Sequence, residues 1–110
     1  MTPYAVVILP VADDTLTEIQ GKLVDWAMTE ASAAAYTKRA RDWCETTLDT
    51  AYDRGDRRDD IQPGLRTQKA GNTNIIAAWV VNNQMKAVVV TGFYHGRSPN
   101  TPMPPGDEDD

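Results

Sequence analysis

The chain has 110 residues, 41% of them hydrophobic and 25% charged, which is typical of one globular domain. Its one cysteine excludes an intramolecular disulfide, and no apolar run is long enough to cross a membrane. The net charge of −5 comes from the two ends, since residues 31–97 carry ten basic and seven acidic residues. We therefore expect a soluble cytoplasmic protein, and the overall acidity argues against general nucleic-acid binding.

The first half of the chain predicts a strand followed by two helices. Residues 4–9 are apolar on both faces, which favours a central strand that Pro10 ends. An acidic cluster with Thr15 at capping-box spacing from Glu18 predicts the start of a helix over 14–29. A second apolar stripe predicts another helix over 32–54. One long bent helix through both segments stays an alternative.

The segment from Arg54 to Thr73 is polar and rich in turn residues, so we expect a long loop with a possible short strand at Leu65–Gln68. The chain ends in a proline-rich stretch with four terminal acids. This composition predicts a disordered tail over 98–110, which leaves a single domain over 1–97.

The segment from Asn74 to His95 predicts a β-hairpin. Two runs rich in β-branched residues flank Asn82-Asn83, a pair that suits a tight type I′ turn. With that turn, Trp79 would lie opposite Lys86, and both faces of the hairpin would be mostly apolar. Such a hairpin needs cover on both sides.

These elements predict an α+β fold: a sheet of three to four strands in β-α-α-β-β order, with helices packed on one face. If strands 4–9 and 75–81 are neighbours, they must be parallel. A homodimer or a protein partner would then cover the second apolar face. We expect Trp79 to be the anchor of that surface, with Lys86 at its rim. The other members of the outward-facing set are Ile75, Ala77, Val88 and Val90.

A catalytic site would have to use His95, the only histidine, which lies near the end of the predicted strand. Arg66, Tyr94 and Arg97 are the candidate partners that could orient a substrate beside it. This set would suit a small RNA- or nucleotide-directed enzyme. The competing interpretation is an ordinary exposed loop histidine.

A basic cluster in the middle of the chain could bind a small anionic ligand through its charged side chains. Acidic residues are interleaved with it, a pattern that also fits a solvated loop. The members of the cluster are Arg57, Arg58, Arg66 and Lys69. Cys44 lies on the apolar stripe of the second predicted helix and favours a buried structural thiol. No phosphate-loop, dinucleotide or metal-ligand motif is present, so no cofactor or metal is expected.

The function that these features favour is a small acidic protein-binding module rather than an enzyme. It would be an inhibitor, an immunity or anti-defence protein, or an assembly factor, of bacterial or phage origin, that acts by occupying a partner's surface. The supports are the small size, the missing catalytic motifs, the excess apolar sheet surface and the acidic ends, which could complement a basic partner. The enzyme and the anion binder are the alternatives.

Overall fold

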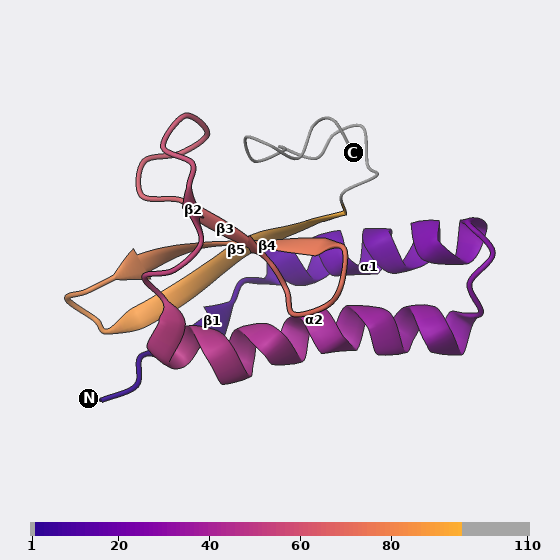
Figure 1. Ribbon diagram of the computed structural model, residues 1–110, viewed down its shortest axis with the longest axis horizontal. Coiled ribbons are helices and arrows are strands. Elements are labelled where there is room, and N and C mark those ends of the chain that lie inside the picture. Colours follow the sequence, from indigo (N-terminus) through magenta and orange to yellow (C-terminus); the bar gives the residue numbers. More distant parts are fainter. Residues whose placement is uncertain (1, 96–110) are drawn as a thin grey trace.

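Two long helices lie side by side along one face of a five-stranded sheet (Figure 1). The computed structural model describes residues 2–95, so Arg97 and the predicted tail over 98–110 lie outside the described residues. The α+β class and the helices on one face are confirmed, but the sheet has five strands rather than three to four. In chain order the elements are β1 (Ala5–Ile8), α1 (Pro10–Asp25), α2 (Glu30–Ala51), β2 (Asp56–Arg57), β3 (Arg66–Lys69), β4 (Ile75–Asn82) and β5 (Ala87–His95).

The strands follow the order β1-β5-β4-β3-β2, with β1 parallel to β5 and every other pair antiparallel. The strand predicted to be central is therefore an edge strand, and its neighbour is β5 rather than β4. Its inner residues Val6 and Ile8 pack against the core, whereas Ala5 and Val7 are exposed on the other face. An apolar pattern on both faces was thus misleading, because no second layer covers these outer side chains among the described residues.

Two separate helices form, so the single long helix is excluded. Proline occupies the first turn of α1, where its missing N–H costs no hydrogen bond, so this helix begins at Pro10 rather than at 14. Thr15 is inside the helix instead of capping it, and its hydroxyl accepts a hydrogen bond from the backbone N–H of Phe93 at 2.9 Å. Thr29 caps α2 by accepting from Ser32 N at 3.1 Å.

The hairpin of β4 and β5 closes through a four-residue turn over 83–86, not through Asn82-Asn83. Asn82 pairs with Ala87, and its side-chain oxygen accepts from Met85 N at 3.1 Å. A bulge between Ala78 and Trp79 then shifts the register. The predicted pairing of Trp79 with Lys86 is wrong because the turn is longer than expected, and Trp79 lies opposite Val90.

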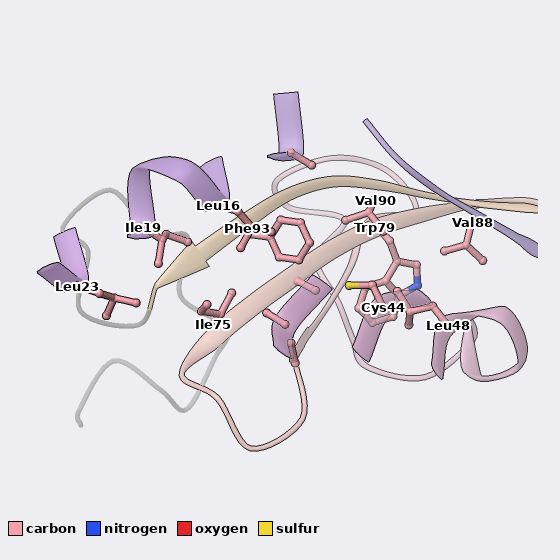
Figure 2. Packing of buried hydrophobic residues seen from close by; sticks show 14 of the residues in the cluster. Leu16, Ile19, Leu23, Cys44, Leu48, Ile75, Trp79, Val88, Val90 and Phe93 are labelled. Carbon is pink, nitrogen blue, oxygen red and sulfur yellow. The ribbon is translucent and has the colours of Figure 1, made fainter. Parts of the chain in front are cut away.

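The predicted outward-facing set of the hairpin faces the helices instead (Figure 2). Trp79 is 0% exposed, its indole N–H donates to the carbonyl oxygen of Tyr52 at 2.9 Å, and its ring meets Trp43 edge-on. The prediction failed because both faces of the hairpin are apolar, so periodicity could not tell which face meets the helices. The core side comprises Ile75, Ala77, Trp79, Val88, Val90 and Phe93. Lys86 lies exposed in the turn.

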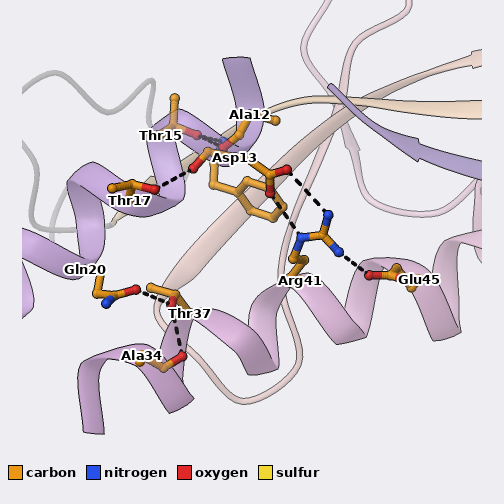
Figure 3. A network of polar contacts seen from close by, with 10 residues as sticks. Ala12, Asp13, Thr15, Thr17, Gln20, Ala34, Thr37, Arg41 and Glu45 are labelled. Carbon is orange, nitrogen blue, oxygen red and sulfur yellow. Dashed lines mark hydrogen bonds and ion pairs between the residues drawn. The ribbon is translucent and has the colours of Figure 1, made fainter. Parts of the chain in front are cut away.

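Polar contacts also join the two helices (Figure 3). The Arg41 guanidinium of α2 pairs with Asp13 of α1 at 3.0 Å and also with Glu45. The Thr37 hydroxyl donates to the side-chain oxygen of Gln20 at 3.2 Å. The ion pairs are partly exposed, and such pairs contribute about 0–1 kcal/mol each. Apolar packing is therefore the main interaction that holds the helices on the sheet. The polar contacts between α1 and α2 add a smaller contribution.

Candidate functional site

His95 is a buried residue on the helix-facing side of the sheet, not an exposed loop histidine. It is the last residue of β5, pairs with Ile75 of β4 and is 4% exposed. Its ring centroid lies 5.3 Å from that of Trp26, the C-cap residue of α1. An imidazole in this position packs between sheet and helix rather than facing an open substrate site.

The other residues of the predicted catalytic set are not gathered around His95. Tyr94 points to the opposite face, where its ring lies over Gly92. Arg66, on β3, lies opposite Trp79 of β4, whereas His95, on β5, lies opposite Ile75 of β4. Along β4 alone, Ile75 and Trp79 are four residues apart, or roughly 13 Å. Arg97 lies outside the described residues. The described part of the chain therefore forms no site that combines these side chains.

The predicted anion-binding residues all lie at the far side of the sheet, around β2 and β3. Arg57 and Arg66 are neighbours in the ladder, and Lys69 ends β3. Arg58 is 8% exposed, and its guanidinium donates to both carboxylate oxygens of Asp60, at 2.9 and 2.8 Å. This bond holds the pKa of Asp60 below its usual range.

The loop between β2 and β3 uses its charges to hold its own shape. Arg57 pairs with Asp59 at 3.2 Å, and the same carboxylate accepts a bond from Gly64 N at 2.8 Å, which lowers the pKa of Asp59. Two of the four predicted anion ligands thus have carboxylate partners nearby. The contacts account for these arginines as structural residues of an ordered loop.

Cys44 is fully buried in α2, and burial raises the pKa of its thiol to about 12. A thiol in that state is protonated at neutral pH and is a poor nucleophile. Within residues 2–95, no group of three His, Cys, Asp or Glu side chains could hold a metal ion. Neither helix of this described part is long and apolar enough to cross a membrane.

The feature that sequence analysis missed is the open edge of β1. Ala5 N donates to Lys86 O at 3.0 Å and Leu9 N to Val90 O at 3.1 Å, so the odd-numbered residues bond to β5. In a parallel ladder the intervening residues point their backbone groups the other way. Val6 and Ile8 therefore direct their N–H and C=O groups away from the sheet, where no described strand pairs with them.

Exposed apolar side chains accompany this edge. Val7 is 45% exposed on β1, and Val11 is 56% exposed in the first turn of α1. Met85 is 76% exposed in the hairpin turn, next to Lys86, whose carbonyl oxygen bonds to β1. No charged residue occurs between Thr2 and Ala12. Sheet edges are usually protected by charges, bulges or an internal proline, and β1 has none of these.

The opposite edge is protected in the expected manner. It consists of a two-residue strand, β2, and the polar strand β3, which together carry Arg57, Arg66 and Lys69. The contrast singles out β1 as the edge suited to pairing with another chain. The sequence signal was the uncharged apolar run between Pro3 and Pro10, which sequence analysis assigned to the sheet centre.

The same fold occurs in chains of two solved toxin–antitoxin systems. A chain of the toxin–antitoxin complex RelBE2 from Mycobacterium tuberculosis is 17% identical, with a TM-score of 0.57 over 86% of this chain and 93% of that one. A chain of the chromosomal ParDE toxin–antitoxin system of P. aeruginosa is 16% identical, with a TM-score of 0.67 over 84% and 95%. At these identities the likeness establishes a shared fold.

No protein-family model matches the chain, and no curated protein sequence is significantly similar to it.

Proposed function

We propose that this protein binds a protein partner along the β1 edge, as one component of a bacterial two-protein complex of the toxin–antitoxin kind. The observation that carries the proposal is the unprotected edge, with outward-pointing backbone groups at Val6 and Ile8 and exposed apolar side chains beside them. The solved neighbours, described as toxin–antitoxin systems, support the choice of partner class.

Strand addition is the mode of binding that this edge suits. An extended segment of the partner pairs with the free N–H and C=O groups of Val6 and Ile8, and backbone hydrogen bonds supply a large part of the affinity. Side chains at alternate positions of the partner segment contact Val7 on the outer face. The apolar surface of Val11 and Met85 widens the contact at the two ends of the strand.

This proposal keeps the sequence hypothesis of a small acidic module that acts by occupying a partner's surface, as an inhibitor, immunity protein or assembly factor. It replaces the hairpin face with the β1 edge, because the hairpin residues named for that role form the core. An enzyme that uses His95 gains no support from the placement of Tyr94 and Arg66, which lie away from it.

Affinity capture from the native host followed by mass spectrometry tests the proposal. The decisive variant is Val6→Pro, which removes the outward N–H and places the proline ring in the path of an added strand, while the bonds of Ala5 and Leu9 to β5 remain. Val6→Ala is the matched control, because it loses the same side-chain packing but keeps the N–H.

We expect the wild type and Val6→Ala to capture the same partner in similar amounts, and Val6→Pro to lose it. Circular dichroism checks that both variants are folded. Capture of that partner by folded Val6→Pro at the wild-type level would place the binding site elsewhere.

A further inference from the structure

We propose that the β1 edge also pairs with the β1 edge of a second copy of this chain, around a two-fold axis at Val7. This self-association shares the β1 edge with the proposed function and does not otherwise depend on it. Because both events need the outward groups of Val6 and Ile8, self-pairing and partner binding exclude each other. The free protein thus protects its own edge until the partner displaces the second copy.

The positions of the outward groups fix the register of the pair. In an antiparallel ladder, hydrogen-bonded pairs alternate with non-bonded pairs. Since the groups of Val6 and Ile8 point outward, Val6 of one copy bonds with Ile8 of the other, and Ile8 with Val6. This arrangement forms about four hydrogen bonds. Val7 then lies opposite Val7 on the two-fold axis, as a self-complementary interface requires.

The side chains on the axis favour self-pairing. Val7 is 45% exposed on the outer face, and in a non-bonded pair the two Cβ atoms come within roughly 4.5–5.5 Å. Two copies of a charged strand would set like charges opposite each other. No charged residue occurs from Thr2 to Ala12, so β1 avoids this penalty.

The far edge lacks these properties. Its outermost strand, β2, has only two residues, Asp56 and Arg57, and both are charged. Pairing through β1 joins the two five-stranded sheets into one continuous sheet. A four-residue strand gives a smaller contact than the roughly 1,200–2,000 Å² of stable complexes, so the dimer is weak and concentration-dependent. Weakness suits a contact that a partner must displace.

The axis at Val7 allows a charge-exchange experiment by sedimentation equilibrium on the full chain, from about 10 to about 500 µM, a range that covers weak association. Wild type shifts from monomer towards dimer across this range. Val7→Lys and Val7→Asp each remain monomeric, because each sets like charges at the axis. An equal mixture of the two variants associates again, at least as strongly as the wild type. Val7 is exposed and outside the core, so both variants fold, which circular dichroism verifies.

Ile61→Lys is the control, since Ile61 is 42% exposed in the loop beside β2 at the far side of the sheet. It should dimerise like the wild type. A wild type that stays monomeric at the highest concentration overturns the proposal, as does a mixture of the charged variants that fails to associate. Neither outcome affects the capture experiment, which measures binding of a different protein, so the two proposals fail separately.

Discussion

At the scale of single residues, Gly55 determines how the chain passes from α2 into the β2–β3 edge. Its φ of +85° lies in the left-handed region that favours glycine. A Cβ atom at this position would lie 2.7 Å from the carbonyl oxygen of Thr67 and 2.9 Å from the Trp79 ring. Both neighbours are buried in the sheet, so neither can move aside easily.

We predict that Gly55→Ala lowers the free energy of unfolding by about 1–3 kcal/mol, because it adds backbone strain to a steric clash. Gly21→Ala is the matched control: Gly21 lies within α1 with nothing within 4 Å of its added Cβ, so this change should stabilise the protein by about 0.5–1 kcal/mol. Urea denaturation of both variants measures the difference. Equal effects would contradict the described path at Gly55.

Sequence analysis ended the second helix at residue 54, directly before Gly55 and close to its observed end at Ala51, but mistook Thr15 for a helix cap. The two differ in the range of the interaction. A glycine after an apolar stripe acts locally, whereas Thr15 bonds to Phe93, which is 78 residues away along the chain. Local spacing contains no information about such a contact.

At the scale of elements, the inner face of β4 depends on Trp79. A carboxylate at this site would have to be buried beside Trp43 and would leave the carbonyl oxygen of Tyr52 without its donor. We therefore predict that Trp79→Glu unfolds the protein rather than yielding a folded monomer. Val7→Glu, on the outer face of β1, should remain folded by circular dichroism and thermal melting. A folded Trp79→Glu variant would contradict the assignment of the two faces.

The loop between β2 and β3 should respond to acid. The bond from Gly64 N lowers the pKa of Asp59, and the bond from Arg58 lowers that of Asp60, both from 3.8. A lowered pKa in the folded state means that the carboxylates stabilise the loop above about pH 4. This contribution is lost as the pH falls through the folded-state values.

We expect the Gly64 amide to be protected from hydrogen exchange at neutral pH, relative to its intrinsic rate, and to lose protection below pH 4. Asp59→Asn keeps an acceptor oxygen that does not titrate, so it should retain protection in acid. Nuclear magnetic resonance measures both. Protection of the wild type that is independent of pH would show that the Asp59 bond does not hold the loop.

The elements with one apolar stripe were the easiest to predict from sequence. Both helices follow from apolar spacing with a helical period, and the existence of the hairpin follows from two β-branched runs on either side of a turn signal. Periodicity could not predict which face of the hairpin meets the helices, nor where β1 lies in the sheet. The reason is that the hairpin strands and β1 are apolar on both faces. The expected and the observed pairings place the same residues together on one face, so only the packing of the helices decides which face is core.

At the scale of the whole molecule, the proline-rich acidic end should be dispensable for folding. Residues 98–110 lack apolar periodicity, so their burial would not compensate for the entropy lost on ordering. We predict that deleting them leaves the melting temperature nearly unchanged by differential scanning calorimetry. A drop of several degrees would show that this segment contributes to the folded domain.

The candidate site depends on the complete sheet, and this is why sequence analysis could not locate it. Whether a strand is central or at an edge depends on which strand joins it after two intervening helices. The apolar, uncharged character of residues 4–9 was visible, but its meaning changed once β5 proved to be the only neighbour of β1 among the described strands. An unprotected edge, unlike a central strand, leaves backbone N–H and C=O groups open to pairing.

The central claim is that the β1 edge binds the protein partner. It is tested most directly by titrating the partner recovered from the host into the isotope-labelled protein and following backbone amide signals by nuclear magnetic resonance. The account predicts that the amides of Val6 and Ile8 show the largest shifts and gain protection from exchange, with smaller changes at Val11 and Met85. Changes confined to β3 and the loop before it, with β1 unaffected, would contradict the account.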